Sequence, residues 1–393
     1  IIKTKMGGGL MQLVAYGAQD IYLTGNPQIT FFKVVYRRHT NFSMEAIEQT
    51  WNGTSDGVAG ANRCTATVSR NGDLVHRMYL ELNGVCLAEA NPSAQGITDI
   101  ELEIGGQKID KHTGQWMNVW SHLTEPNPSG YAGVVDSDST KATLFQNMSG
   151  MGGAYGHTTA ATKFWVPLQF WFCRNPGLAL PLIALQYHEV KVIMNHNWSL
   201  GFGTSLTCDL YCDYIYLDTD ERRRFAQVSH EYLIEQVQEQ TVDVAGKSAD
   251  LNFNHPVKEL IWCVDNPTAG VLTTIGTAAS SATYQLKLNG HDRFAARDWK
   301  YFSRAQVWQH HTGAGGLTAA SSAAAGKFSD GIGVYSFALK PEEHQPSGTC
   351  NFSRIDNAQL VGSTSHALAN RVYAVNYNVL RIMSGMGGLA YSN

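Results

Sequence analysis

The sequence predicts an all-β protein built from two consecutive copies of one β-unit. Three observations support this prediction. Stretches of alternating polar and apolar residues dominate the chain, which is the pattern of strands that bury one face. Asn-Gly and Gly-Gly pairs interrupt these stretches at short intervals, as hairpin turns do. The layout of the first half also returns in the second half at offsets of about 170 to 190 residues.

Four pairs of segments carry this repeat, in the same order in both halves. They are Ile47–Gln49 with Ile234–Gln236, His76–Val85 with His255–Val264, Glu101–Gly106 with Gln285–Gly290, and Phe164–Phe170 with Val334–Lys340. One such match carries little weight, because short apolar alternation recurs by chance. Four matches in one order indicate an internal duplication. Short strands with regular turn signals then predict a β-sandwich or barrel in each half rather than β-α-β units.

The strand candidates have one apolar face each. Ile100, Leu102 and Ile104 alternate with two glutamates and end at the turn pair Gly105-Gly106. The stretch Thr207–Asp218 alternates in the same way and precedes a run of charged residues. This arrangement predicts that the first copy ends there.

Helical periodicity is rare. The best candidate is His112–Thr124, where Trp116, Trp120 and Leu123 recur at helical spacing. This helix would lie inside a long connection between two strand candidates, Thr113–Lys163, and the second copy has a long connection at the equivalent place. Paired long loops indicate an elaborated surface, where function is found more often than in strands.

The domain organisation follows from these elements. We expect an N-terminal arm over residues 1–24, a first β-domain over 25–218 and a second over 219–393, with the boundary near Leu217–Arg224. The long connection of the second copy contains a Gly/Ala/Ser-rich part, 313–326, that is expected to be flexible.

Composition limits the classes of function. The 393 residues are enough for two domains. Only 16% of them are charged, which indicates a surface that is largely uncharged or in contact with neighbours. A net charge of −4 argues against a nucleic-acid coat, because that role needs a strongly basic face. Seven cysteines without framework spacing indicate reduced thiols in an intracellular setting.

Neither a membrane span nor a secretory signal is visible. The longest apolar runs are far below the roughly 18 residues that a membrane helix needs, and no signal peptide pattern opens the chain. The chain begins at Ile1, and Met6 is a candidate start of translation. We therefore expect a soluble protein with only an indirect relation to membranes.

Histidines and cysteines offer no convincing metal site. A cupin-type site needs two histidines one residue apart, and no His-x-His occurs. The pairs His188-Glu189, His230-Glu231 and His310-His311 would place their side chains on opposite faces of a strand. Cys208 and Cys212 would share one face, but no second pair completes a zinc site. A structural role is favoured for all of them.

Carboxylates and glycines give the same result. Glu101 with Glu103 and Glu342 with Glu343 are not distinguished from a solvated surface, so they do not indicate a glycosidase pair. The glycine-rich segments lack the Walker pattern. We therefore predict no catalytic, cofactor-binding or metal-binding residues.

Asn-x-Ser/Thr sequons mark candidate glycan sites. They begin at Asn41, Asn52, Asn147, Asn197 and Asn351. Asn41 and Asn351 lie beside strand candidates and are expected to be inaccessible. Asn147 lies in the long loop and is the preferred acceptor, although the lack of a secretory signal argues against ordinary glycosylation.

Long runs of the chain resemble one known family. The opening Ala15–Asp20 followed by Ile21–Phe32 is similar to that of the major capsid proteins of nucleocytoplasmic large DNA viruses, most closely those of the chlorella-infecting algal viruses. The resemblance continues through Lys33–Phe42, Glu101–His112, Asn175–Val192, Phe225–Gln238, Leu251–Pro256, Phe337–Asn357 and Tyr377–Asn393. It fails mainly around 55–62, 125–160, 268–283 and 311–329. Matched runs over nearly the whole chain are more specific than any short motif.

This resemblance implies a double jelly roll, which is two eight-stranded antiparallel sandwiches in tandem with long loops and few short helices. It implies a non-enzymatic capsid protein whose homotrimers form six-lobed capsomers in the icosahedral outer shell of the virion. The partners it implies are neighbouring capsomers and minor capsid proteins, with the internal membrane contacted only indirectly. No cofactor and no direct nucleic-acid binding are expected. Assembly in the host cytoplasm, covalent glycans and a placement of Ile1–Gln19 beneath the capsomer are further expectations.

Two other functions remain open for a scaffold of this kind. A carbohydrate-binding or host-attachment protein would use the aromatic-rich Trp116–Trp120 region, and glycan-array binding would favour it. A cupin-like metal-dependent enzyme would carry stoichiometric bound metal. The capsid building block is the leading hypothesis, because the duplication, the absence of a catalytic pattern and the resemblance all agree with it.

Overall fold

The computed structural model describes residues 32, 34–36, 39–127, 130, 133–135, 142–157, 162–203, 205–242, 248–266, 271–273, 275, 282–319, 327–363 and 371–391. Contacts divide the chain into two units, Ile1–Asn41 and Phe42–Asn393. The described residues of the first unit form no helix or strand, and the arm expected over 1–24 lies outside the described residues. The elements below all belong to the second unit.

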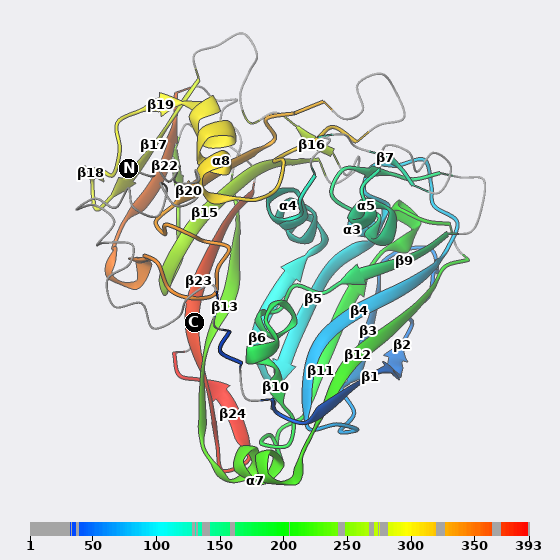
Figure 1. Ribbon diagram of the computed structural model, residues 1–393. Coiled ribbons are helices and arrows are strands. Elements are labelled where there is room, and N and C mark those ends of the chain that lie inside the picture. Colours follow the sequence, from blue (N-terminus) through cyan, green and yellow to red (C-terminus); the bar gives the residue numbers. More distant parts are fainter. Residues whose placement is uncertain are drawn as a thin grey trace, which may run out of the picture. The chain divides into compact units, whose positions relative to one another are not determined.

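The first half forms two antiparallel sheets (Figure 1). One sheet has the order β1 (Phe42–Gln49), β12 (Thr207–Leu217), β4 (Leu74–Gly84) and β10 (Leu180–Pro181), with β9 (Thr162–Pro167) also paired to β4. The other has the order β2 (Trp51–Gly53), β3 (Asn62–Thr67), β11 (Val190–His196), β5 (Ile97–Ile104) and β6 (Gln107–Thr113). A short parallel pair, β7 (Gly133–Val134) and β8 (Ala154–Tyr155), lies in the long connection.

The second half repeats this plan. One sheet has the order β13 (His230–Thr241), β23 (Arg371–Met383), β15 (Pro256–Asn266) and β16 (Val271–Thr273), with β20 (Ile332–Ser336) and β21 (Cys350–Asn351) on β15 and β24 (Met386–Leu389) on β23. The other has the order β14 (Ser248–Asp250), β22 (Ala358–Gly362), β17 (Thr283–Leu288) and β18 (His291–Asp292), with β19 (Arg297–Asp298) also on β17.

Helices are short and lie in the connections. In the described part of the chain, the α-helices are α3 (Pro92–Gly96), α4 (Gly114–Thr124), α5 (Leu144–Ser149), α6 (Trp171–Arg174), α7 (Thr219–Gln227) and α8 (Gln306–His310). A π-turn, η4 (Tyr301–Ala305), leads into α8, and the 3-10 turns are η2 (Pro176–Leu178), η3 (Trp198–Leu200) and η5 (Phe352–Arg354). No helix among the described residues has the length and apolarity of a membrane span.

The sheet topology confirms the internal duplication. The order β1-β12-β4 with β9 on β4 matches the order β13-β23-β15 with β20 on β15. The four segment pairs found in the sequence fall on the equivalent strands β1 and β13, β4 and β15, β5 and β17, and β9 and β20. The turns Gly105-Gly106 and Asn289-Gly290 both have two residues of positive φ, which is the requirement of a type I′ hairpin turn.

The helix predicted over His112–Thr124 is confirmed in type, but it begins at Gly114. The Thr113 side chain accepts a hydrogen bond from the Trp116 backbone N–H at 3.2 Å and so caps the helix. His112 stays in β6 because its backbone pairs with Ile100 of β5.

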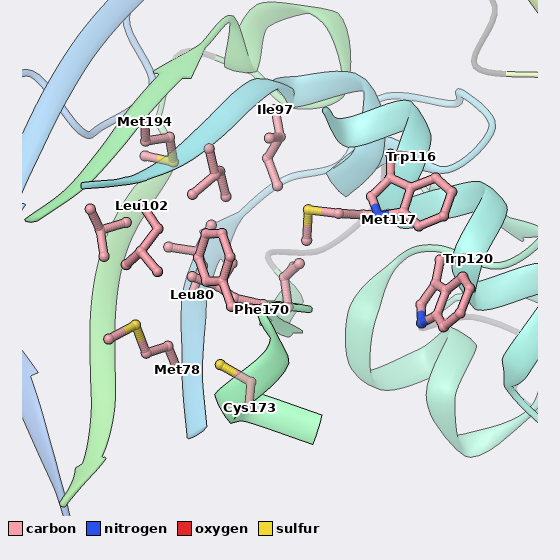
Figure 2. Close-up of a cluster of buried hydrophobic side chains, with 14 of the residues drawn as sticks. Met78, Leu80, Ile97, Leu102, Trp116, Met117, Trp120, Phe170, Cys173 and Met194 are labelled. Carbon is pink, nitrogen blue, oxygen red and sulfur yellow. The ribbon is translucent and has the colours of Figure 1, made fainter. Parts of the chain in front are cut away.

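The apolar core explains why the two halves form one body. Figure 2 shows part of it, with Met117 extending from α4 toward Leu102 and Leu80. This larger core continues into the second half, where it includes Tyr373 and Val375 of β23. Val372 and Ala374, which alternate with them along β23, belong to a separate core inside the second sandwich. The β13-β23-β15 sheet is therefore covered on both faces, by its own sandwich and by the first half.

Candidate functional site at the junction of the two barrels

The described residues contain no group of three or more His, Cys, Asp or Glu side chains placed to hold a metal ion. The histidines of the two His-Glu pairs contact backbone carbonyls instead. His188 lies 2.9 Å from the Gly387 carbonyl oxygen through Nδ1, and His230 lies 2.8 Å from that of Phe225 through Nε2. The expectation that His310-His311 lies in a strand is wrong, because His310 is the last residue of α8 and His311 is the C-cap of that helix.

The cysteines are packing residues. None of the seven is in a disulfide, and all except Cys350 are buried. Cys208 and Cys212 lie on the buried face of β12, where burial raises the pKa of each thiol well above its ordinary value. A thiol held neutral in this way is a poor metal ligand and a poor nucleophile.

The tryptophans proposed for glycan binding are buried. Trp116 is 2% exposed and Trp120 is 3% exposed. Trp116 packs against Tyr373 of β23, with ring centroids 5.1 Å apart. The interpretation of Trp116–Trp120 as a sugar-binding surface is therefore wrong, because these rings join the first half to the second.

A buried charge network lies at the same junction. Glu235 of β13 accepts hydrogen bonds from Arg174 of α6 at 2.6 Å and from Lys258 of β15 at 2.7 Å. The Lys258 side chain is 0% exposed and that of Glu235 is 3% exposed. The Arg174 guanidinium also lies over the Trp120 ring, 5.3 Å from its centroid. One carboxylate thus binds cations from both halves, with Lys258 fully buried and the Arg174 side chain 23% exposed.

The pKa values reflect this closeness. Burial alone would raise the pKa of Glu235, but Arg174, His344 and Lys258 together hold it well below its usual range. Burial lowers the pKa of Lys258, and the neighbouring Glu235 opposes that change. The Glu235 carboxylate therefore favours the charged form of Lys258, and the charge of Glu259 acts in the same direction.

A second cluster surrounds His311. Its Nε2 lies 3.0 Å from Glu259 Oε2, and its Nδ1 lies 3.0 Å from Glu342 Oε1. Both ring nitrogens must donate to bond two carboxylates, so the ring is an imidazolium. Burial would lower the pKa of His311, but the two carboxylates raise it to about 9. The ring packs edge-on against Trp120, with centroids 6.3 Å apart.

The segment that follows His311 caps helix α4 of the first half. The Gly313 N–H donates to the Leu123 carbonyl oxygen at 2.7 Å, and the Gly315 N–H donates to that of His122 at 3.0 Å. These carbonyls lie in the last turn of α4, where no partner is available within the helix. A Cβ on Gly313 would lie 2.3 Å from the His122 carbonyl oxygen, so the close approach requires glycine.

Two edge strands complete the junction. β6 of the first half lies against β13 of the second. The Gln236 amide donates to the Ile109 carbonyl oxygen, and the Val237 N–H donates to Asp110 Oδ1 at 3.1 Å. A cleft of about 670 Å³ lies beside this contact, and residues of β5, β6 and β13 form part of its lining. The two barrels are thus joined along α4, through the charged clusters and along one pair of strand edges.

The sequon residues are placed differently from expectation. Asn147 lies on α5 and is half-buried, and the hydroxyl of Ser149 in the same sequon is buried and donates to the Phe145 carbonyl oxygen at 2.8 Å. Asn41 and Asn351 are exposed, so the expectation that they are inaccessible is wrong. Asn41 directly precedes β1, and Asn351 is the last residue of β21, where it pairs with Pro256 of β15.

Comparison with known proteins identifies the family. Residues 30–218 match the family of the major capsid protein N-terminus, and residues 221–388 match the large eukaryotic DNA virus major capsid protein. The major capsid protein of Pyramimonas orientalis virus is 53% identical, over 99% of this chain and 100% of its own length. The chain belongs to the major capsid proteins of large eukaryotic DNA viruses. It is a structural protein of the viral capsid.

Further relatives support the same family and fold. The major capsid protein of Paramecium bursaria Chlorella virus 1 is 42% identical over 99% of this chain and 100% of its length. A solved PBCV-1 virus capsid is similar with a TM-score of 0.73 at 37% identity, covering 93% of this chain and 100% of that chain. The Faustovirus major capsid protein shares the fold alone, with a TM-score of 0.63 at 12% identity, covering 95% of this chain and 96% of that chain. The resemblance found in the sequence is confirmed, as is the double jelly roll.

Proposed function

We propose that three copies of this capsid protein form a homotrimeric capsomer with six lobes, which tiles the flat faces of the icosahedral shell. The observation that supports the proposal is the junction between the two barrels. It buries Lys258 and Glu235 and covers both faces of the β13-β23-β15 sheet. Two similar barrels held in one orientation let a threefold assembly imitate a sixfold one. A hinge between the barrels would lose that match.

The mass of the protein in solution tests this proposal. We expect a species of three times 43.1 kDa in native mass spectrometry and in light scattering coupled to size exclusion. The expected mass should persist on dilution, because a closed ring makes three contacts at once. A monomer at high protein concentration would overturn the proposal.

The finer organisation belongs to the same proposal. We assign an N-terminal arm to residues 1–24, the first jelly roll to 25–218 and the second to 219–393. Residues 1–19 lie beneath the capsomer, and its partners are neighbouring capsomers and minor capsid proteins. The internal membrane is contacted only indirectly, nucleic acid is not bound directly, and assembly takes place in the host cytoplasm. Cross-linking within purified virions, read by mass spectrometry, tests these contacts.

Asn147 remains the proposed acceptor of a covalent glycan. Its half-buried position on α5 and the buried Ser149 hydroxyl require that the sugar be added before this helix packs. Peptide mass spectrometry of the chain from virions tests the assignment. An unmodified peptide containing Asn147 would overturn it.

A further inference from the structure

The contact between β13 and β6 joins two barrels that descend from one duplicated unit. Within a chain, β13 of the second barrel lies along β6 of the first. In a ring of six lobes, three such contacts lie inside chains and three must lie between chains. The second set must join the second barrel of one copy to the first barrel of the next.

The duplication identifies the strands at those equivalent positions. β1 is the equivalent of β13, because each is the first strand in the order β1-β12-β4 or β13-β23-β15. β18 is the equivalent of β6, because each follows the tight turn after β5 or β17 and pairs with that strand. The Arg293 N–H continues this ladder by donating to the Leu286 carbonyl oxygen at 2.8 Å. Arg293 therefore occupies the region that Ile109 and Asp110 occupy in β6.

We propose that the outer edge of β1 in one copy docks on the edge of β18 and Arg293 in the next copy, repeating between chains the β13–β6 contact made within each chain. The inference rests on the proposed trimer. It names the interchain surface of that trimer, which nothing in the family match specifies.

Both edges are available for this contact. Among the described strands, β1 pairs only with β12 and β18 pairs only with β17. Met44 of β1 is 49% exposed, and residues 291–293 are all exposed. A strand edge with exposed apolar side chains favours pairing with another chain unless it is covered.

The chemistry of the two edges is complementary, but it differs from that inside the chain. Gln236 reaches across to Ile109 within the chain, whereas its equivalent Gln49 is turned inward and accepts from the Ser69 N–H at 2.9 Å. In the contact between chains, an ion pair would replace the hydrogen bond that Gln236 makes within the chain. Glu48 of β1 and Arg293 are both exposed, and neither has an ion pair within the described residues. Glu48 of one copy can therefore face Arg293 of the next.

Charge reversal tests the pairing. Glu48→Arg and Arg293→Glu should each raise the dissociation constant of the trimer at least about tenfold, because each sets like charges opposite one another. The double variant should recover most of the loss. Glu231→Arg is the matched control, since Glu231 is 60% exposed on β13, away from the proposed contact, and should leave the trimer unchanged.

Cross-linking gives a second readout. In a Cys350→Ser background, Glu48→Cys with Arg293→Cys and a short bis-maleimide should yield covalent dimers and trimers on denaturing gels, while either single variant should not. A wild-type trimer that shows no interchain product and no response to charge reversal would overturn this inference and leave the trimer standing. The absence of a wild-type trimer would overturn the proposed function and this inference with it.

Discussion

The substitution Glu235→Gln should lower the free energy of unfolding by several kcal/mol, although it barely changes the volume of the side chain. Glutamine keeps the volume of Glu235 and removes its charge, while Lys258 stays 0% exposed. Arg174 and Lys258 then lose the carboxylate that both contact, and Glu259 is the carboxylate that still acts on the charge of Lys258. Breaking a buried ion pair from one side costs about 3–5 kcal/mol, because the remaining charge is left without a partner.

This cost converts into a measurable change in melting temperature. A folded unit of about 350 residues unfolds with an entropy of about 0.7 kcal/mol/K, so a loss of 3–5 kcal/mol lowers Tm by about 4–7 °C. Differential scanning calorimetry at fixed protein concentration measures the shift. The concentration must be held constant because assembly also stabilises the folded chain.

A matched control separates burial from charge. Glu231→Gln is the same chemical change on the same strand, in an exposed pair with Arg381 at 2.9 Å, and should lower Tm by about 1 °C or less. Adding Lys258→Met to Glu235→Gln should recover part of the loss, since the stranded charge is removed. A Tm for Glu235→Gln within about 1 °C of wild type would show that the buried charge of Glu235 does not stabilise the folded chain.

Two further predictions concern the same junction. Gly313→Ala should destabilise the protein by about 1–3 kcal/mol, because its Cβ would collide with the His122 carbonyl oxygen, whereas Gly203→Ala meets nothing within 4 Å and should be neutral in the same melting assay. The charge on His311 should make stability depend on pH, because the pKa of this group is raised from 6.5 to about 9. Its contribution, about 3 kcal/mol, is complete below pH 6.5 and is lost as the pH rises through 9. His311→Gln should flatten Tm against pH over that window while His310→Gln should not, and equal slopes for wild type and His311→Gln would contradict the assignment.

The strands were predictable from local pattern because their chemistry is local. Alternation at Ile100, Leu102 and Ile104 places one face of β5 in the core, and the glycines that follow permit the hairpin. The duplication was readable for the same reason, since equivalent strands need similar faces. The helical spacing of Trp116 and Trp120 likewise predicted α4.

The junction was not predictable in this way. Trp120 has the same helical spacing whether it faces solvent or a second barrel, and the sequence offered a sugar-binding surface as an alternative. Glu235 stands in the sequence only as part of a repeated segment, Ile234–Gln236, yet its carboxylate contacts both Arg174 and Lys258. The sequence predicted a structural role for His311, but it could not identify the two carboxylate partners, which are 52 and 31 residues away in the chain.

The amino-acid sequence was enough to predict two similar β-domains. Its long runs of similarity to the capsid protein family were enough to indicate the family. Those properties depend on residue periodicity and on composition along the chain. Only the tertiary structure decided how the domains are joined, because a buried charge is stable only where partners from distant segments converge on it. It also decided which strand edges are covered within the chain, since β13 lies against β6 while β1 pairs only with β12 among the described strands.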